Sequence, residues 1–502
     1  MYTKLSKISS SDINKEISII GYVHTIRDQK KIYFVLIRQQ HVILQCCAKE
    51  EELLKYIQNI ECESIVEVKG ILKLRNESQI NLSMQLGKYE LYITSFKLIQ
   101  KPYKSIDIRG CADWSDENMN KERYIALRSN VVYDKVLFFS DVSQTIRSFL
   151  LKRDFVELVL PNLAPLPGTG AAVFQVHSQH FPDSVFSLSQ SPQIFKQLLM
   201  IGDSKNYFSM AKCFRDESSR SDRVKEFIQC DVEMGAVSSS KDIMTLGEEL
   251  VRELFKKYLP NFNIRLETWS FKRALAEYGS DYVNLNVIDE YNLKVENETI
   301  IINNRDNIYN VIKEKGEDIQ YYDKEKNLIC FHRSNHGIYR ILNTSALQYK
   351  SKDISCVWLV DVPMYEVDSM GEKSFTHNPF CKTKHVEIIE GKEEIIADQY
   401  DFLLCGFEIF GGSIRENNAN KLVEQLKNVG YSDERIYTEF EALINGYKYG
   451  SLLHGGFGLG VERLCTLLDG IKNFNIESIR NYIVFPQKQD GSSSMLNMPQ
   501  KK

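Results

Sequence analysis

Apolar and polar residues alternate through most of the first hundred positions of the chain. This period of two predicts five strands, and a helical spacing of apolar residues separates the third from the fourth. The strands are expected at 17–27, 32–38, 41–48, 64–74 and 91–97, and the helix at 50–60. Five short strands with one helix between them favour a small barrel of the oligonucleotide- or oligosaccharide-binding type, the OB-fold.

Beyond this region the pattern changes three times. A polar stretch with Pro102 and Gly110 predicts a hinge. From about position 122 apolar residues recur every three or four positions, which predicts a long helix followed by a strand that runs into Pro161, and a second helix is expected at 243–259. We therefore expect a barrel at 1–100, a hinge at 101–121, a main domain in two parts at 122–269 and 352–502, and an inserted small domain at 270–351.

Composition narrows the class of protein. Of 502 residues, 43% are hydrophobic and 26% are charged, which is typical of a globular protein with sizeable cores. The formal charge is −4, and such weak acidity leaves RNA binding open because local basic patches steer nucleic acid. No apolar run approaches the roughly 18 residues of a membrane span, so we expect no membrane partner. The first residues lack the apolar core of a secretory signal.

Eleven cysteines are scattered along the chain without a CxxC pair or a zinc-site spacing. This usage predicts reduced, mostly buried thiols in a cytosol-like compartment.

The first segment with chemistry in it covers residues 207–234. It reads as a strand, a charged loop and a returning strand. Such a hairpin could hold Arg215 and Arg223 over a polyphosphate, while Phe227 offers a ring to a flat base.

The second segment covers residues 400–418. Asp401 and Glu408 are seven positions apart and could meet across one strand and its bend, and two carboxylates beside phosphates suit Mg²⁺. The glycines at 411 and 412 allow the backbone to approach a ligand closely, and Arg415 follows them with a guanidinium fork.

The third segment, HGGFGLGVERLCTLL at 454–468, combines small residues with Arg463 at the expected start of a helix.

Each of these segments also has an ordinary structural explanation. An arginine-rich loop is usually solvated, an isolated pair of acids is usually no metal site, and a glycine-rich string alone is weak.

Taken in order, the segments resemble the class II aminoacyl-tRNA synthetases, and among them the aspartyl-tRNA synthetases. The strand ending at Pro161 is similar to the first motif of that class, FRDE at 214–217 with Arg223 to the second, and GLGVER at 458–463 to the third. QSPQIFKQ at 190–197 and GGSIR at 411–415 resemble the amino-acid-specific segments. The resemblance covers nearly the whole chain. It implies an α+β fold, with an N-terminal OB-fold barrel and a catalytic domain built on an antiparallel sheet flanked by helices.

The resemblance implies two substrate sites. The ATP site would consist of Arg215, Glu217, Arg223, Phe227, Gln229, Glu408 and Arg463, with Arg215 and Arg463 as the catalytic pair, and Mg²⁺ would be held by Asp401 and Glu408. The aspartate site would consist of Gln193, Lys196, Asp231, His377 and Arg415. Lys196 and Arg415 would bind the side-chain carboxylate, and we expect asparagine to be rejected because its neutral amide would leave two buried cations unpaired.

In the barrel, the resemblance implies that Arg27, Phe34 and Gln45 bind the anticodon of tRNA(Asp). Stacking of a base on an aromatic ring is worth about 1–3 kcal/mol. The alternative is that Phe34 belongs to the barrel core. The resemblance further implies a homodimer formed through the first-motif helix and strand.

The sequence departs from the family pattern at four places. Gly168 or Thr169 stands where a loop glutamate is usual, so aspartate affinity is expected to be weaker. Asn378 follows His377 where a second histidine is usual, so His377 alone is carried over. Phe410 replaces a glycine and is expected to narrow the pocket, and the insertion is shorter than in bacterial relatives.

Two alternatives to a dedicated aspartate–tRNA ligase stay open: a relaxed ligase that also charges tRNA(Asn), and a catalytically impaired RNA-binding paralogue. Only the missing loop glutamate favours the paralogue, since a binding protein has no need of an ATP and Mg²⁺ site. We expect the cytoplasm as the compartment, with the mitochondrion or another organelle as the alternative.

Overall fold

The computed structural model describes residues 2–104, 108–166, 172–217, 223–278, 280–285, 352–368, 370–389, 391–473 and 476–500. Between 286 and 351 it describes the backbone of seven short strands: β13 (Leu293–Glu296), β14 (Thr299–Ile302), β15 (Tyr309–Asn310), β16 (Lys313–Lys315), β17 (Asp318–Tyr322), β18 (Leu328–Arg333) and β19 (Tyr339–Ile341). The predicted inserted domain at 270–351 falls largely outside the described residues. Among the described residues no helix is long and apolar enough to cross a membrane.

Contacts divide the chain into two units. One contains residues up to Asp134 together with those from Ser494 onward, and the other runs from Lys135 to Ser493. The predicted hinge at 101–121 belongs to the first unit and contains the short helix α2 (Asp116–Lys121), which Ser115 caps by accepting from the amide of Asn118. The domain boundaries expected from the sequence stay predictions.

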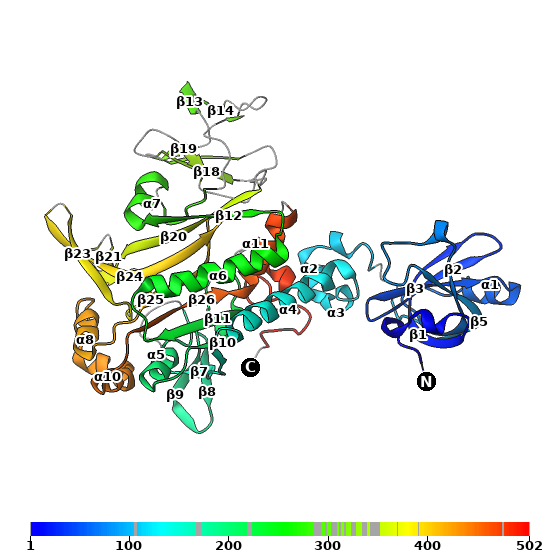
Figure 1. The fold of residues 1–502 in the computed structure, drawn as a ribbon, viewed down its shortest axis with the longest axis horizontal. Helices are drawn as coiled ribbons and strands as arrows, with labels where there is room; N and C mark the ends of the chain where they lie inside the picture. Colours follow the sequence, from blue (N-terminus) through cyan, green and yellow to red (C-terminus); the bar gives the residue numbers. More distant parts are fainter. Residues whose placement is uncertain are drawn as a thin grey trace. The chain divides into compact units, whose positions relative to one another are not determined.

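The N-terminal strands close into a barrel, as the alternation predicts (Figure 1). Its elements are β1 (Glu16–Asp28), β2 (Tyr33–Gln39), β3 (Val42–Ala48), α1 (Glu51–Ile57), β4 (Ile65–Leu74) and β5 (Tyr89–Gln100), with strand order β1-β2-β3-β5-β4. Alternate side chains such as Val35, Ile37 and Leu44 are fully buried inside it. The predicted OB-fold is confirmed.

The second unit is built on one large, mostly antiparallel sheet, with order β12-β20-β24-β25-β26-β11-β10-β6 and β23 paired with β24. Its strands are β6 (Val156–Glu157), β10 (Tyr207–Phe214), β11 (Glu226–Gly235), β12 (Asn263–Ser270), β20 (Asp353–Pro363), β23 (Thr383–Ile389), β24 (Lys392–Leu404), β25 (Phe407–Ile414) and β26 (His454–Gly460). Smaller sheets combine β7 (Leu163–Ala164), β8 (Gln175–Ser178) and β9 (Phe181–Leu188), and β21 (Tyr365–Val367) with β22 (Lys373–Phe375).

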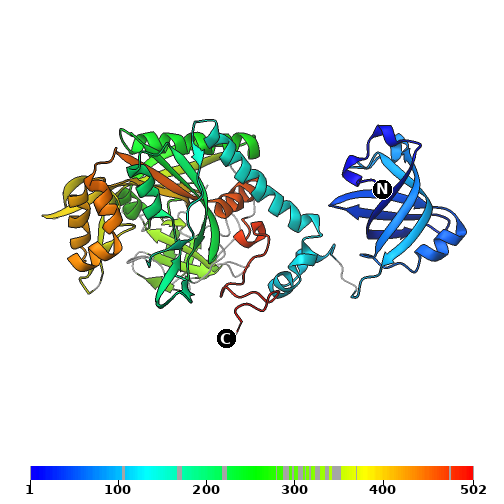
Figure 2. The ribbon, with the colours of Figure 1, turned by 90° about the horizontal axis from the view of Figure 1, so that it is seen from below.

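One face of the sheet is covered by long helices. α4 (Asn130–Leu151) and α6 (Ser240–Tyr258) lie side by side, since Lys257 donates to Asp141 at 2.8 Å and Tyr258 donates to Asp141 at 2.9 Å (Figure 2). α11 (Val461–Asn473) packs into the same apolar core. The remaining helices are α3 (Arg123–Ala126), α5 (Gln193–Ile201), α7 (Phe271–Tyr278), α8 (Ala419–Lys427), α9 (Asp433–Glu439) and α10 (Glu441–Lys448).

Strict alternation along the central strands separates this core from the site. On β11, Cys230 and Val232 are buried in the core, so Gln229, Asp231 and Glu233 project from the opposite face. On β26, Phe457 and Leu459 enter the core and the intervening glycines face the other way. A polar pocket therefore opens on the face that the long helices leave uncovered.

Two predicted elements differ in the structure. The long helix expected from 122 is divided into α3 and α4, because Ser129 starts a new helix by accepting the amide of Tyr133 with its carbonyl. The strand expected to reach Pro161 shrinks to β6, which lies at the sheet edge, where proline and irregular backbone are tolerated.

Candidate active site

Two adjoining cavities on the open face of the sheet collect every residue that the sequence predicts for the second unit. The larger, of about 480 Å³, is lined by Gln193, Lys196, Arg215, Glu217, Gln229, Asp231, His377, Asp401, Glu408 and Arg415, among others. The smaller, of about 190 Å³, is lined by Arg215, Glu217, Arg223, Phe227, Gln229, Glu408 and Arg463, among others. Their shared residues make the two one continuous site. The individual roles assigned to these residues stay predictions.

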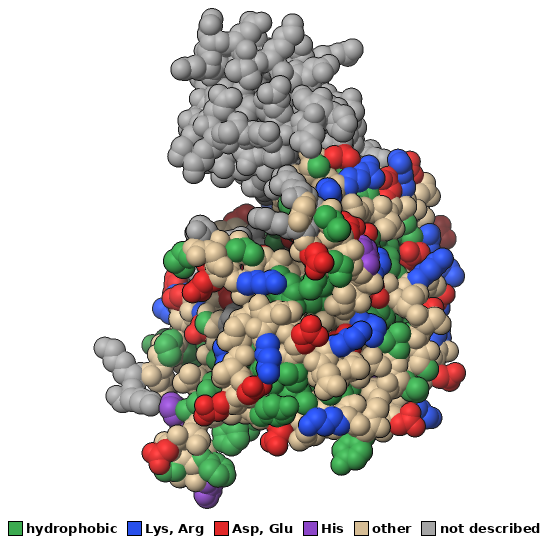
Figure 3. Space-filling model, turned by 90° about the vertical axis from the view of Figure 1, so that its left-hand side faces the viewer, with side chains coloured by type: hydrophobic (Ala, Val, Ile, Leu, Met, Phe, Trp, Pro, Cys, Tyr) green, Lys and Arg blue, Asp and Glu red, His purple; other side chains and the backbone are tan. Residues whose placement is uncertain are grey.

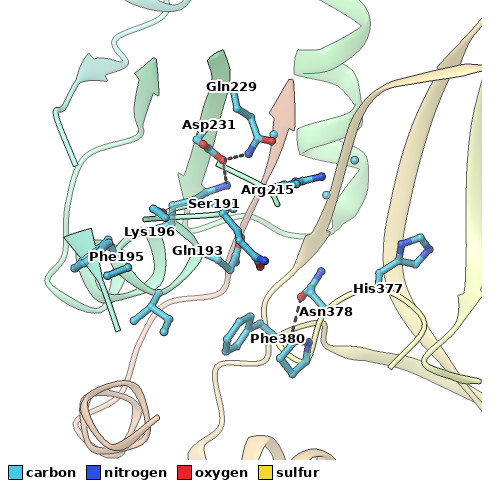
Figure 4. Close-up of a pocket in the computed structure, with 18 of the residues that line it drawn as sticks. Ser191, Gln193, Phe195, Lys196, Arg215, Gln229, Asp231, His377, Asn378 and Phe380 are labelled. Atoms are coloured by element: carbon cyan, nitrogen blue, oxygen red, sulfur yellow. Dashed lines mark hydrogen bonds and ion pairs between the residues drawn. The ribbon is translucent and has the colours of Figure 1, made fainter. Parts of the chain in front are cut away.

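A buried quartet of charges forms the floor of the larger cavity. Nζ of Lys196 lies 2.9 Å from Asp231 Oδ1 and 3.4 Å from Glu233 Oε1, and Arg415 Nη2 lies 2.6 Å from Glu233 Oε1. Figure 4 shows Lys196 pointing at Asp231, and Gln229 donates to the same carboxylate oxygen, Oδ1, at 3.0 Å. All four charged side chains are at most 2% exposed. Mutual pairing makes their burial tolerable.

This pairing acts on the pKa values of Glu233 and Arg415. Burial alone would raise the pKa of Glu233, but Arg415 and Lys196 hold it below its usual value. Burial disfavours the charge on Arg415, yet the Glu233 carboxylate keeps the pKa of Arg415 above its usual value. The expectation that a neutral ligand leaves Lys196 and Arg415 unpaired is therefore wrong, because both cations have carboxylate partners within the protein. Two basic side chains thus face two acidic ones.

Polar atoms with no protein partner surround the quartet. The Nε2 atom of Gln193, the Oδ2 atom of Asp231 and the Oε2 atom of Glu233 are buried without a hydrogen-bond partner. Since buried polar groups are normally satisfied, such atoms indicate where a ligand supplies the missing partners. Of these residues Gln193 and Asp231 line the larger cavity, and one donor beside one carboxylate oxygen fits a ligand that carries both an oxygen acceptor and an ammonium group.

Two further carboxylates face each other across the hairpin of β24 and β25. A Cβ atom placed on Gly411 would lie 2.5 Å from Asp401 Oδ1 and 2.7 Å from Glu408 Oε1, so both acids converge on a spot that only glycine leaves open. Burial, together with the charge of Glu408, raises the pKa of Asp401 well above its usual value. This pair fits Mg²⁺, which takes one or two carboxylates and completes its shell with water and phosphate oxygens.

His377 lies on the side of the cavity away from Lys196 (Figure 4). Its Nε2 atom is 3.9 Å from Asp401 Oδ2, and burial lowers its pKa. The structure thus places His377 beside the acid pair and apart from the charge quartet.

The smaller cavity has the groups that a nucleotide requires. The guanidinium of Arg215 lies 5.2 Å from the ring centre of Phe227, and Arg223 lies 3.5 Å from Glu217. Arg463 donates to the carbonyl of Glu408 at 2.6 Å. On the face of the molecule in Figure 3, acidic and basic side chains alternate over the described surface without a field of one sign. The basic side chains that line this cavity are Arg215, Arg223 and Arg463, so we expect phosphate binding to depend on them.

Phe410 does not narrow the pocket, contrary to the expectation from the sequence. It is fully buried in the apolar core, stacked on Phe402 with ring centres 4.7 Å apart, and it lines neither cavity. Gly247 of α6 makes room for the ring, since a Cβ there would lie 2.9 Å from Phe410 Cε2. Plain alternation along β25 places Phe410 on the same face as Ile414, toward the helices, and the register shift between Phe402 and Leu403 lies beyond it, on the side of Glu408.

Replacing Phe410 with glycine, the residue usual in the family pattern, is expected to lower the free energy of unfolding by about 3–5 kcal/mol. The reason is that it opens a large cavity in a packed aromatic cluster. Chemical denaturation followed by tryptophan fluorescence would measure this loss. The affinity of the pocket for its ligand should stay within about twofold, and a clear gain in affinity would restore the narrowing hypothesis.

The loop with Gly168 and Thr169 lies outside the described residues. Sequence reasoning also missed Glu233, which holds Arg415. The signal was available, because Asp231 and Glu233 are two positions apart in a strand and must share a face.

On the barrel, the three residues predicted to bind an anticodon lie on one outer face. Arg27 pairs in register with Phe34, and Arg27 Nη2 lies 3.4 Å from Gln45 Oε1. Phe34 is partly exposed and is no member of the barrel core, which disfavours the core alternative. Gln45 in turn donates to Glu90 at 2.6 Å, so this face also contains an acid that sequence reasoning missed.

Comparison with known families gives two matches. Residues 115–489 match the tRNA synthetases class II (D, K and N), and residues 17–99 match the OB-fold nucleic acid binding domain of the tRNA anti-codon family. The first match covers well over half of the chain.

Individual relatives agree with this placement. The chain is 28% identical to the aspartate–tRNA(Asp/Asn) ligase of Prochlorococcus marinus (strain MIT 9515), and 28% identical to the aspartate–tRNA ligase of Buchnera aphidicola subsp. Acyrthosiphon pisum (strain APS). Each alignment covers 98% of this chain and 96% of the relative. The crystal structure of asparaginyl-tRNA synthetase from Pyrococcus horikoshii with asparaginyl-adenylate superposes with a TM-score of 0.66 at 20% identity, over 97% of this chain and 98% of that one, and this likeness supports the fold alone.

Proposed function

This chain belongs to the class II tRNA synthetases of the D, K and N group, and on that premise we propose that it is an aspartate–tRNA ligase. It activates L-aspartate with ATP and transfers the aspartyl group to the 3′ end of tRNA(Asp). The observation that carries the proposal is the buried quartet, in which Lys196 and Arg415 present donors to the larger cavity beside the arginines of the nucleotide cavity.

The quartet favours aspartate over asparagine through the direction of its hydrogen bonds. Lys196 and Arg415 carry N–H donors and no acceptor. A side-chain carboxylate can accept hydrogen bonds from both residues. The NH₂ group of an amide is itself a donor, so it could not accept a hydrogen bond from the residue that it faces. The unpartnered atoms of Gln193 and Asp231 suit the α-carboxyl and α-ammonium end of the amino acid.

The reaction follows from this placement. An oxygen of the aspartate α-carboxylate attacks the α-phosphorus of ATP, and the bond to pyrophosphate breaks to give a mixed anhydride. A terminal hydroxyl of the tRNA then attacks the acyl carbon, and AMP leaves. Arg215 neutralises charge on the α-phosphate and Arg463 on the departing pyrophosphate, so positioning and charge stabilisation account for most of the rate. Mg²⁺ held by Asp401 and Glu408 would add charge neutralisation at the phosphates.

The test is ATP–pyrophosphate exchange by the purified protein with aspartate, asparagine or lysine. Exchange with aspartate alone is the expected result. Exchange with asparagine in place of aspartate would overturn the proposed specificity. Exchange with none of the three would favour the RNA-binding paralogue.

A relaxed specificity for tRNA is a second candidate, because one relative is named for both tRNA(Asp) and tRNA(Asn). Charging of purified tRNA(Asn) transcripts with aspartate, measured beside tRNA(Asp), decides between the two.

Replacing Phe34 with alanine is expected to raise the KM for tRNA(Asp) by about tenfold or more, since one stacked base contributes about 1–3 kcal/mol. Exchange in the absence of tRNA should keep its wild-type rate. Tyr103→Ala removes a fully exposed aromatic of the same unit and serves as the matched control. If exchange and charging fall together, Phe34 supports the fold and does not contact tRNA.

We also propose a homodimer formed through α4 and the segment that follows it. Apolar side chains of this region are solvent-exposed in the single chain, namely Leu137, Leu151, Val159 and Leu163, and Val159 is 96% exposed. Such a patch suits a two-fold interface. Sedimentation equilibrium at micromolar protein should give twice the chain mass, and a monomer would contradict the assignment.

The proposed compartment is the cytoplasm, with an organelle as the alternative. The cysteines in the described part of the chain carry no disulfide, as in proteins of reducing compartments. Localisation of a tagged protein in its own cell would decide between the two.

A further inference from the structure

Beside the nucleotide cavity, the central strand of the sheet ends before its two neighbours. β26 lies between β25 and β11 and stops at Gly460, and its last pairs are Gly460 with Gln229 and Leu459 with Phe410. β11 extends beyond this level to Glu226 and β25 to Phe407. Both strands therefore have backbone groups there that no longer face a strand.

The first turn of α11 supplies partners for both strands. The carboxylate of Glu462 accepts the amide of Ile228 at 2.9 Å from Oε1 and 3.1 Å from Oε2. The next residue, Arg463, donates to the carbonyl of Glu408 on the other side. Consecutive side chains thus continue the hydrogen bonding of β26 after the strand itself has ended.

The setting of Glu462 is costly for a carboxylate. The residue is 5% exposed, and burial raises its pKa to about 7, although the start of a helix favours a negative group. The charged groups that act on it are Glu226, which disfavours its ionisation, and Lys212, which favours it. A carboxylate buried at this energetic cost is expected to have a role besides packing.

The hydrogen bond that Glu462 accepts acts on the neighbouring site residues. The Ile228 amide belongs to the planar peptide that joins Phe227 to Ile228, so holding this amide constrains ψ of Phe227 and φ of Ile228, and with them the backbone from which the Phe227 side chain projects. Phe227, Gln229 and Glu462 all line the smaller cavity, and Arg215 lies over the Phe227 ring.

We propose that Glu462 is a positioning residue for the nucleotide, which fixes the Phe227–Ile228 peptide so that the Phe227 ring is held ready to stack on a base. The inference rests on the use of ATP as a substrate in this family. It is independent of which amino acid the larger cavity takes.

Binding of Mg²⁺–ATP to the full-length protein by equilibrium dialysis, without amino acid, tests this inference. Glu462→Ala is expected to raise the Kd for ATP about tenfold, because a hydrogen bond to a charged partner is lost. Glu462→Gln keeps an acceptor for the amide and should restore the Kd to within about twofold. In the exchange assay, the KM for aspartate should be unchanged in both variants.

Thr466→Val is the matched control, since Thr466 lies one turn further along α11, is 4% exposed and donates to the carbonyl of Glu462 at 3.0 Å. It should leave the ATP affinity unchanged.

Three results would each overturn the proposal: an unchanged Kd for ATP in Glu462→Ala, an equal loss of ATP affinity in Glu462→Gln, or a parallel rise of the KM for aspartate. If the alanine variant does not fold, Glu462→Asp takes its place, because its side chain is one methylene shorter. The Kd for ATP should then rise while the KM for aspartate stays unchanged.

These outcomes are separable from those for the proposed function. A protein that binds ATP but gives no aspartate-dependent exchange would contradict the ligase, while the dialysis series would still report on Glu462.

Discussion

Replacing Lys196 with alanine is expected to reduce aspartate-dependent exchange by about 10³-fold or more. Removing one partner of a buried, hydrogen-bonded charge pair costs about 2–5 kcal/mol, and the reacting aspartate loses a donor at the same time. Asp231 and Glu233 would also lose a partner in the interior, which should lower the free energy of unfolding by about 3–5 kcal/mol. Exchange kinetics and chemical denaturation measure the two effects.

The matched control is Lys257→Ala. Lys257 pairs with Asp141 at the same kind of distance, 2.8 Å, but is 43% exposed. Its loss should change stability by less than about 1 kcal/mol and leave exchange intact. ATP binding, which involves the neighbouring cavity, reports whether Lys196→Ala remains folded. Near-normal exchange in a folded Lys196→Ala protein would remove Lys196 from the aspartate site.

Replacing Asp401 with asparagine is expected to act in opposite directions on activity and on stability. Exchange should fall by about 10²–10³-fold, because a bound metal ion contributes several kcal/mol of charge stabilisation. The free protein should gain about 0.5–2 kcal/mol of stability, because the change removes the cost of burying the Asp401 charge and its repulsion with Glu408. Exchange rates over a Mg²⁺ titration and thermal unfolding without the cation would show both effects.

Asp361→Asn provides the comparison, since Asp361 is an acid of the neighbouring strand β20 that pairs with Lys384 at 2.6 Å. It should alter neither the Mg²⁺ requirement nor the rate. A wild-type Mg²⁺ dependence in Asp401→Asn would show that the cation binds elsewhere.

The sequence predicted those parts of the molecule in which local pattern decides structure. The period-two alternation of the barrel strands determines which side chains face inward, so its five strands were expected close to their observed positions. The motif segments likewise predicted which residues meet in the site, although Arg215 and Arg463 are far apart along the chain.

The sequence could not predict features that depend on partners from distant segments. Glu408 reaches the site because the register of β25 shifts between it and Phe410, and a string of residues does not reveal such a shift. The strand pattern could place Glu233 on the face of Asp231, but its pairing with Arg415 becomes apparent only when β11 and β25 lie in one sheet. At 270–351 the apolar pattern is only weakly periodic and did not predict individual helices or strands.

The fit between Gly247 and Phe410 links the evolutionary histories of two positions that are 163 residues apart. In a relative with glycine at position 410, a side chain at 247 would no longer meet the phenyl ring, although its Cβ would still lie 3.3 Å from Trp358 Cη2. Where the phenyl ring is present, a side chain at position 247 would clash with it, so substitution of Gly247 is disfavoured until the ring is lost. The two sites should therefore change together across descendants. An engineer who transfers either residue alone into a relative should expect a damaged protein, whereas moving both as a unit should succeed.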